Sequence, residues 1–462
     1  MQQSFIDEEL INSLLQKNPD PSDSAVKSVL ARAENLKGLS IEDAAILLNT
    51  NNSELLELLF NTACRIKQTI YGNRIVLFAP LYISNYCSNN CLYCGFRSDN
   101  NEIQRKRLTI DEVKSETRIL LEQGHKRILM LMGEEDSASS LDYFAECIKA
   151  AYSVKDSKGN SIRRINIEIA PLTTDEFKKL KPLNIGTYVV FQETYHRETY
   201  DRIHPSGKKK DYIRRLDVME RALESGLHDV GIGALFGLYD YRFDTLALLT
   251  HAKHLDEKFG IGPHTISVPR IEYAKNAPCA ENIPYPVSDI DFKKIAAVLR
   301  CAVPYTGIIL STRENARMRS ELMHLGVSQL SAGSKTDPGG YGQNNHTSSQ
   351  FSLNDTRSTG EIIASVIDEG FVPSFCTGCY RRGRTGKDFM DMAKPGLIKN
   401  HCHPNALLTL KEYLIDYADE KTKLSGEDLI TKEIESIPGR KRREETEKNL
   451  AKIEQGERDI YF

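Results

Sequence analysis

The sequence lacks any long apolar run, any large excess of one charge sign and any internal repeat beyond an alternation of short strand-like and helix-like segments. No stretch approaches the ~18 consecutive apolar residues of a membrane-spanning helix, so none is expected. With 61 basic and 64 acidic side chains the net charge is −3, which argues against the broad positive surface of a nucleic-acid-binding protein. These absences favour a small-molecule substrate and predict no nucleic-acid or membrane partner.

The amino-terminal segment MQQSFIDEELINSLL also lacks the basic stretch and apolar block of an export signal, so we expect a cytoplasmic protein. In that reducing compartment the ten cysteines are not expected to form a disulfide framework. Six of them fall into two tight groups, which indicates metal chemistry. The remaining four are expected to be buried apolar thiols: Cys64, Cys147, Cys279 and Cys301.

The 462 residues, 40% hydrophobic and 27% charged, can bury a sizeable core. Residues 5–70 carry helical spacing, and from Arg74 short aliphatic runs alternate with amphipathic helices, as in repeated βα units. Eight such runs are present: RIVLFAPLYI from Arg74, RILMLMG from Arg127, RINIEIA from Arg164, TYVVFQ from Thr187, DVGIGALFG from Asp229, HTISVP from His264, TGIILST from Thr306 and VSQLSAG from Val327. Eight strands close a barrel, so the sequence predicts an α/β fold with a (β/α)8 TIM barrel; an open doubly wound sheet is the alternative.

Three domains are predicted from this pattern. Residues 1–72 form a helical amino-terminal extension, residues 73–335 the barrel, and residues 336–462 a carboxy-terminal module. The segment 334–358 is rich in Gly, Ser, Asn and Asp and is predicted to be a long polar loop that leaves the barrel. The last thirty or so residues are dense in both charge signs, which indicates a solvated helix.

The first cysteine group lies directly after the first predicted strand. In SNYCSNNCLYCGFR the residues Cys87, Cys91 and Cys94 have the spacing C-x3-C-x2-C. Three thiolates on so short a loop can hold three irons of a [4Fe–4S] cube and leave the fourth iron open to an exogenous ligand. A structural zinc loop completed by a distant residue is the alternative.

The spacing, the aromatic Tyr93 before the third cysteine and the position after the first strand resemble radical S-adenosylmethionine (SAM) enzymes. The resemblance implies that SAM chelates the open iron and is cleaved to a 5′-deoxyadenosyl radical. Gly133 and Glu134 resemble the Gly-Glu element of that family that binds the SAM amino group. Glu168 lies within an otherwise apolar strand, where its carboxylate needs a partner, either a SAM ribose or a nearby arginine.

Polar residues at the carboxyl ends of barrel strands are expected to gather on one face, where barrel enzymes carry their sites. Arg313, in LSTRE after the seventh run, is placed to form a bidentate pair with a carboxylate, although it could be an ordinary surface arginine. His264 opens the sixth run, which is out of place for a residue of the barrel mouth. Single histidines are mostly not ligands, so position alone does not assign it a role.

A second cysteine group lies near the carboxy terminus. Cys376, Cys379 and Cys402 have the spacing C-x2-C-x22-C. A structural zinc with His401 or His403 as fourth ligand and an iron–sulfur cluster explain that spacing equally well.

Taken together, the two groups resemble the HydG family of [FeFe]-hydrogenase maturases, which are tyrosine lyases, over almost the whole chain. The matching segments are YISNYCSNNCLYCGF, GPHTISVPRIE, LSTRE, FCTGCYRRGRTGKDFM, AKPG and CHPNALLT. The thiazole-pathway tyrosine lyases share the first motif and the barrel but are not expected to carry the second cysteine group. Within RIEYAKNAP the chain departs from the family by having Tyr273 where Pro is frequent, at a position expected to be remote from the chemistry.

The resemblance implies a reaction in two stages. L-tyrosine is cleaved at Cα–Cβ to p-cresol and dehydroglycine, and its carboxylate binds Arg313 near Ser311 and Thr312. Dehydroglycine then passes through the barrel to a second [4Fe–4S]-type auxiliary cluster on Cys376, Cys379 and Cys402. There it yields CO and cyanide on an additional iron, which His264 binds.

An electron donor and hydrogenase maturation proteins are the implied partners. Two alternatives stay open: a tyrosine lyase that stops at dehydroglycine for thiamine thiazole synthesis, and a non-enzymatic zinc or iron–sulfur protein.

Overall fold

The computed structural model describes residues 4–135, 140–343 and 348–462. None of the helices in these ranges combines the length and the hydropathy needed to cross a membrane. Part of the polar loop predicted at 334–358, residues 344–347, lies outside the described ranges.

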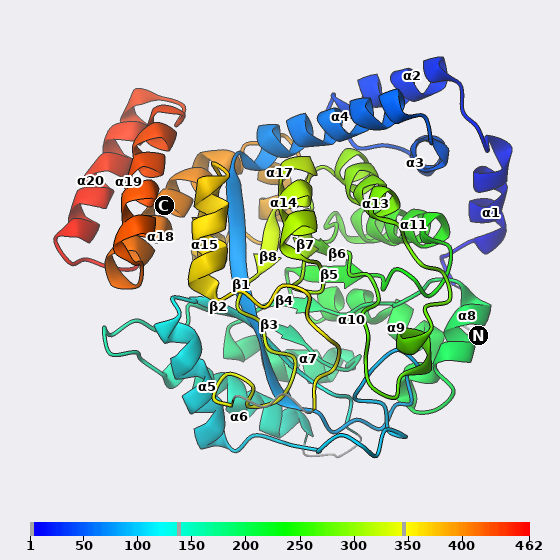
Figure 1. The fold of residues 1–462 in the computed structure, drawn as a ribbon, viewed down its shortest axis with the longest axis horizontal. Coiled ribbons are helices and arrows are strands. Elements are labelled where there is room, and N and C mark those ends of the chain that lie inside the picture. Colours follow the sequence, from blue (N-terminus) through cyan, green and yellow to red (C-terminus); the bar gives the residue numbers. More distant parts are fainter. Residues whose placement is uncertain (1–3, 136–139, 344–347) are drawn as a thin grey trace.

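A closed parallel barrel forms the centre of the protein (Figure 1). Neighbouring strands pair in the order β2-β3-β4-β5-β6-β7-β8-β1, and a further pairing of β1 with β2 closes the ring. Closure confirms the predicted barrel and excludes the open doubly wound sheet. The barrel strands are β1 (Arg74–Ser84), β2 (Arg127–Met132), β3 (Arg164–Glu168), β4 (Ile185–Val189), β5 (Val230–Gly233), β6 (Thr265–Ser267), β7 (Gly307–Leu310) and β8 (Gln329–Ser331).

A ninth strand, β9 (Val372–Ser374), was not predicted. It pairs in parallel with Arg74–Val76, the first residues of β1. The segment of β1 that pairs with β2 lies closer to the carboxyl end of the strand. Pro373 lies at its centre and has no N–H to donate, so the short run did not read as a strand. Because β9 extends the sheet at the amino end of β1, the residues that follow it lie at the base of the barrel.

Helices connect the strands and cover the outside of the barrel. Typical is α5, which begins with a capping box: the Thr109 hydroxyl accepts from the Glu112 N–H, and the Glu112 carboxylate accepts from the Thr109 N–H. The connecting helices are α5 (Ile110–Glu122), α6 (Ser140–Ser153), α7 (Thr174–Leu180), η1 (Lys181–Leu183), α8 (Arg197–Ile203), η2 (Lys208–Lys210), α9 (Tyr212–Leu216), α10 (Val218–Glu224), α11 (Tyr241–Phe259), α12 (Pro278–Glu281), α13 (Asp289–Ala302) and α14 (Ala316–Leu325).

Both ends of the chain add helices to the outside of the barrel (Figure 1). The amino-terminal group packs on α11 and α13, whereas α18 packs on β9 and carries α19 and α20. These helices are α1 (Glu8–Lys17), α2 (Asp23–Ala33), α3 (Ile41–Asn49) and α4 (Ser53–Tyr71), and α15 (Thr359–Asp368), α16 (Gly378–Arg381), α17 (Gly386–Ala393), α18 (Lys399–Asp416), α19 (Glu420–Glu435) and α20 (Arg440–Glu454). The division into three domains at residues 72 and 335 stays a prediction.

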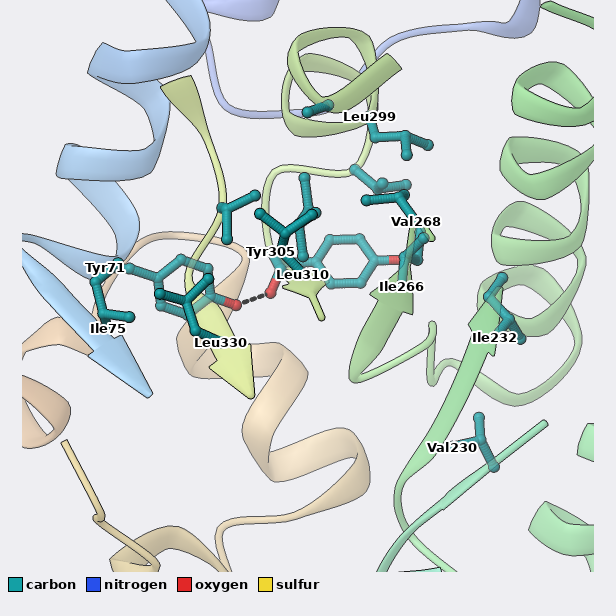
Figure 2. Close-up of a cluster of buried hydrophobic side chains, with 14 of the residues drawn as sticks. Tyr71, Ile75, Val230, Ile232, Ile266, Val268, Leu299, Tyr305, Leu310 and Leu330 are labelled. Carbon is teal, nitrogen blue, oxygen red and sulfur yellow. Dashed lines mark hydrogen bonds between the residues drawn. The ribbon is translucent and has the colours of Figure 1, made fainter. Parts of the chain in front are cut away.

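Outward-facing strand residues are aliphatic and pack beneath the helices. Figure 2 shows Ile232, Ile266 and Leu310 from neighbouring strands in one buried cluster, bounded by Tyr71 at the end of α4 and Tyr305. The Tyr71 hydroxyl donates a hydrogen bond to the Tyr305 carbonyl, which ties the amino-terminal helices to the barrel. Burial of such side chains contributes about 1.5 to 3 kcal/mol each, so this layer holds the barrel together.

Inward-facing residues are different, because side chains alternate between the two faces of a strand. Many of them are polar or glycine, and they alternate around the barrel with aliphatic residues such as Val76, Leu129 and Ile309. Gln329, for example, lines a cavity at each end of the barrel. The polar inward-facing side chains near the middle are Asn166, Thr187, Thr265, Ser267, Gln329 and Ser331.

Candidate active site and auxiliary metal centre

The first cysteine group lies where predicted, in the loop that leaves the carboxyl end of β1. Gly133, after β2, packs directly against this loop, and a Cβ atom there would lie 2.3 Å from the Tyr86 carbonyl oxygen. Ser88 N–H donates to the Glu134 carbonyl at 2.9 Å. The Gly-Glu element therefore holds the cysteine loop in place through its backbone and its lack of a side chain at Gly133.

In this loop Cys91 is buried and Cys87 and Cys94 are half-buried, and none of the three forms a disulfide. Burial raises the pKa of Cys87 to about 11 and also raises the pKa of Cys91 and Cys94. Two amide side chains face the sulfurs: Asn89 Nδ2 lies 3.8 Å from Cys87 Sγ, and Gln350 Nε2 lies 3.6 Å from Cys94 Sγ. N–H donors of this kind stabilise thiolates, so the donor set fits three irons of a cluster, whose binding would release the thiol protons.

Across residues 4–135, 140–343 and 348–462, no three His, Cys, Asp or Glu side chains converge as the ligands of a single ion must. A cubane differs because each thiolate binds a different iron, so its ligands stand further apart.

A cavity of about 130 Å³ lies at the mouth of the barrel, next to Cys94. It brings together five residues that the sequence analysis selected: Tyr93, Glu168, Ser311, Thr312 and Arg313. They come from the cysteine loop and from the carboxyl ends of β3 and β7, as expected for a barrel enzyme. Neither Gly133 nor Glu134 lines this cavity, because both lie behind the cysteine loop.

Arg313 is the basic group of the mouth cavity that the described carboxylates leave unpaired. Its guanidinium carbon lies 3.3 Å from the centre of the Phe351 ring, and burial lowers the pKa of the side chain. Phe351 belongs to the polar loop after β8, which returns over the mouth. There Gln350 accepts a hydrogen bond from the Tyr82 hydroxyl at 2.7 Å. Arg313 is thus free to form a bidentate pair with a substrate carboxylate.

The second cysteine group lies at the opposite end of the barrel. Cys376 and Cys379 follow β9, and Cys402 lies in α18; all three line a small cavity together with His264. The Gly378 N–H donates to Cys376 Sγ at 3.3 Å. A hydrogen bond from the Cys379 thiol, aided by Arg74, lowers the pKa of Cys402 to about 6 despite its burial. A cluster with thiolate ligands is suited to this set of donors.

Known proteins resemble this chain over most or all of its length. Residues 81–249 match the Radical SAM superfamily model, and residues 267–372 match the Biotin and Thiamin Synthesis associated domain. The Escherichia coli 2-iminoacetate synthase is 34% identical over 346 residues, which is 74% of this chain and 88% of that protein. A crystal structure of HydG, a maturase of the [FeFe]-hydrogenase, is 52% identical, superposes with a TM-score of 0.96 and covers 100% of both chains.

The HydG structure from Carboxydothermus hydrogenoformans is 42% identical, with a TM-score of 0.83 and 96% coverage of each chain. The chain belongs to the HydG family of radical SAM tyrosine lyases. The first HydG structure covers 100% of the chain, so its match includes the carboxy-terminal segment with Cys376, Cys379 and Cys402. The 2-iminoacetate synthase match covers 74% of the chain.

This HydG-family protein carries a charged network behind the cysteine loop that sequence reasoning largely missed. Glu193, after β4, adopts a left-handed backbone conformation with φ 72°. Its carboxylate lies 2.6 Å from Lys209 Nζ and 3.7 Å from an Arg215 nitrogen, and these cations lower its pKa despite complete burial. Arg215 also pairs with Glu134 at 3.0 Å. From the sequence, only the position of FQET after the fourth strand pointed to a role for Glu193. No local motif pointed to Lys209 or Arg215.

Glu134 was expected to bind the SAM amino group with its carboxylate. In the structure that carboxylate accepts hydrogen bonds from Arg215 and from the Asn89 side chain. Its role toward SAM stays a prediction.

The Glu168 carboxyl faces the mouth cavity and makes no ion pair with a described arginine or lysine. Burial, reinforced by the neighbouring Glu193, raises its pKa to about 7, although Lys209, Arg215 and Arg313 act in the opposite direction. The salt bridge considered from the sequence is therefore absent among the described residues, and a hydroxyl-rich ligand remains as its predicted partner.

His264 lies immediately before β6, at the amino end of the barrel, so it belongs to the base and not to the mouth. Its Nδ1 lies 3.4 Å from Asp229 Oδ1, close enough for an ion pair but outside well-aligned hydrogen-bond geometry. A carboxylate behind one ring nitrogen is typical of histidines that bind a metal through the other. Neither His401 nor His403 lines this cavity, and His403 instead contacts Glu433 at 3.2 Å.

Proposed function

We propose that this enzyme converts L-tyrosine to p-cresol, CO and cyanide in two stages at the two ends of its barrel, for assembly of the [FeFe]-hydrogenase active site. At the mouth, the adenosyl radical takes one hydrogen atom from tyrosine, and Cα–Cβ cleavage yields dehydroglycine and a C7H7O radical, which one electron from the donor and one proton convert to p-cresol. At the base, dehydroglycine (HN=CH–COOH) yields CO, HCN and H2O, which balances without an oxidant or reductant. The supporting observation is one barrel with a three-cysteine group beside a cavity at each end, and with Gln329 lining both cavities.

Mouth residues bind and orient the reactants in this proposal. Cys87, Cys91 and Cys94 would hold a [4Fe–4S] cluster, which would supply the electron for reductive cleavage of SAM and so a radical able to take hydrogen from tyrosine. Arg313 binds the tyrosine carboxylate, with Ser311 and Thr312 beside it at the end of β7. Tyr93 and Glu168 face the SAM side of the same cavity, and the loop that carries Phe351 limits access of water.

The barrel interior then provides the passage for dehydroglycine. Gln329 lines both cavities, and it is flanked by Val76 and Ile309 on the neighbouring strands. Gly231 and Gly307 face inward, where a Cβ atom would lie 2.5 Å from Thr265 Oγ1 and 2.4 Å from Gln329 Nε2 respectively. A polar interior suits a small carboxylate that hydrolyses in bulk water.

At the base, Cys376, Cys379 and Cys402 hold the auxiliary [4Fe–4S]-type cluster, and His264 binds the additional iron. Such metal chemistry can capture CO and cyanide as ligands. The Asp229 carboxylate fixes the imidazole of His264 in orientation. An electron donor for the mouth cluster and hydrogenase maturation proteins that receive the iron product complete the scheme. A cytoplasmic location stays a prediction.

Anaerobic reconstitution with iron and sulfide, followed by reduction with SAM and tyrosine, tests the proposal. The expected products are p-cresol, cyanide and CO, the last detected by its binding to deoxyhaemoglobin. Formation of p-cresol without CO would favour a tyrosine lyase that stops at dehydroglycine. One or two zinc atoms and no iron after anaerobic purification would favour the non-enzymatic alternative.

A further inference from the structure

Each of the first three barrel strands begins with an arginine: Arg74, Arg127 and Arg164. Alternation along β1 places Arg74 in the same inward register as Phe78 and Tyr82, which line the mouth cavity. The same parity relates Arg127 to Leu129, and Arg164 to Asn166. This register places all three residues on the inward face of their strands at the base of the barrel.

These arginines are buried, with exposed fractions of 8% for Arg74, 4% for Arg127 and 8% for Arg164. The Nε atom of each is buried without a hydrogen-bond partner among the described residues. Arg74 makes no side-chain hydrogen bond within that part of the chain. Arg127 donates only to the Tyr380 hydroxyl at 3.1 Å, and Arg164 only to the Asn184 side chain at 2.7 Å. A buried guanidinium with so few partners is costly unless an anion joins it.

No described carboxylate supplies that anion. Asp229 is nearby, but its Oδ1 accepts from the Gly386 N–H at 3.2 Å and faces His264. At the mouth, by contrast, Arg215 is paired with both Glu134 and Glu193. The base thus holds an excess of buried positive charge.

Two of the arginines share the cavity of the auxiliary cysteines. Arg74 and Arg127 line it together with Cys376, Cys379 and Cys402, and Gln329 connects it to the barrel interior. Arg164 lies just outside, its guanidinium carbon 4.2 Å from the centre of the Tyr380 ring, in an adjoining outer pocket. Thiolates that bind a cluster would offset part of this positive charge. Among the cationic groups, Arg74 has the largest electrostatic effect on Cys402.

We propose that Arg127 and Arg74, with Arg164 behind Tyr380, form a binding site for a small carboxylate anion at the inner side of the auxiliary cysteines. The site rests on the proposed function and deepens it: its ligand is the two-carbon imino acid that arrives through the barrel. A guanidinium binds a carboxylate through two parallel N–H···O bonds and so fixes its orientation. Arg127 is the central residue, because it faces the shared cavity and Tyr380 is its single hydrogen-bond partner among the described side chains.

Oxamate is a suitable probe because it keeps the carboxylate and nitrogen of dehydroglycine without forming imines. Labelled oxamate is dialysed to equilibrium against reconstituted, oxidised holoenzyme, in which no turnover occurs. Wild type should bind two equivalents, one at Arg313 and one at the base. Arg313→Ala and Arg127→Gln should each lose a different one, so that the double variant binds none. Equal binding by wild type and Arg127→Gln would overturn the proposal.

Turnover gives a second readout in the same preparations. Arg127→Gln should lower the CO formed per p-cresol at least 10-fold and release glyoxylate, the hydrolysis product of dehydroglycine. An unchanged ratio of CO to p-cresol contradicts the base site. Absence of CO in wild type, with p-cresol present, contradicts the proposed function instead, and oxamate binding still reports on the arginines.

Three control variants separate anion binding from structure. Tyr380→Phe removes the hydrogen bond of Arg127 but keeps its charge, so oxamate affinity should stay within about 2-fold. Lys387→Gln removes one positive charge from an exposed residue of the outer pocket and should have no effect. If Arg127→Gln loses auxiliary iron, Arg127→Lys decides: it should bind oxamate about 3- to 10-fold more weakly, and wild-type affinity in this variant would refute a bidentate arginine.

Discussion

The two ends of the barrel carry similar cysteine sets in different settings. At the mouth, three cysteines lie in one loop and the surrounding cations are paired with Glu134 and Glu193. At the base, the cysteines come from two separate segments, and the arginines that begin β1, β2 and β3 lack carboxylate partners among the described residues. Among the described residues, Arg313 is the mouth arginine that awaits a carboxylate, whereas three arginines at the base have none.

Loss of the cysteines is expected to have the largest effect and to divide the two ends. Cys91→Ala should abolish p-cresol, cyanide and CO together, because the first stage supplies the second. Replacing Cys376 and Cys379 by Ala should abolish CO while p-cresol formation largely persists. Product analysis with iron determination checks both. Loss of p-cresol in the second variant, with the mouth cluster intact, would mean that the base is structural for the mouth.

Arg313→Ala is expected to have the next largest effect. Loss of a charge-assisted bidentate pair costs about 1.5 to 3 kcal/mol, which corresponds to a rise in the tyrosine KM of about 10- to 100-fold. Steady-state kinetics of p-cresol formation measures it. Arg313→Lys keeps the positive charge and should have a tyrosine KM between those of wild type and Arg313→Ala. An unchanged KM in the alanine variant would show that Arg313 does not bind the tyrosine carboxylate.

Glu168 tests the electrostatics of the mouth through pH. Its pKa is about 7 in the folded chain against 4.5 as the ordinary value, so the folded state holds the proton more tightly than the unfolded state. The stabilisation from this proton is complete below pH 4.5 and is lost as the pH rises through 7. The Glu168→Gln variant has no carboxyl group that titrates at this position. Between pH 5 and pH 8 it should therefore gain about 2 to 3 kcal/mol in free energy of unfolding relative to wild type.

Denaturant unfolding of the protein without SAM at both pH values provides this measurement. A constant difference between Glu168→Gln and wild type would show that the carboxyl is already ionised at pH 5.

The smallest expected effect concerns the passage that joins the two ends. Gln329→Leu keeps the approximate size of the side chain but removes its polar atoms from both cavities. Because a carboxylate must then pass an apolar group, CO per p-cresol should fall several-fold while glyoxylate rises by a matching amount. Ser331→Ala, on the same strand, is the control for a general change in the interior. An equal ratio of CO to p-cresol in wild type, Gln329→Leu and Ser331→Ala would show that dehydroglycine does not pass Gln329.

Local patterns predicted much of the fold. All eight barrel strands were identified from aliphatic runs, although β4 begins at Ile185, two residues before the predicted Thr187. The mouth could also be predicted, because parallel strands deliver residues such as Glu168 and Arg313 to one face. Those inferences need only periodicity and the direction of the chain.

Contacts between distant segments were beyond such patterns. The sequence analysis did not anticipate β9, the return of Phe351 over the mouth, or the pairing of Glu193 with Lys209 and Arg215. His264 illustrates the limit: its position before β6 was read as out of place for the mouth, and the structure puts it at the base beside Asp229. Proximity of this kind depends on how separate loops pack, and no spacing records it.

By itself the sequence determined the barrel, the two cysteine groups and the family, because periodicity, motif spacing and turn residues act over short distances along the chain. Only the tertiary structure decided that the cysteine groups face opposite ends of one polar interior. It alone also brought Arg74 and Arg127 to the auxiliary cavity, with Arg164 in the adjoining outer pocket, and none of the three has a carboxylate partner among the described residues. Closing the barrel places residues far apart in the chain on a common axis, and the charge balance at each end depends on that closure.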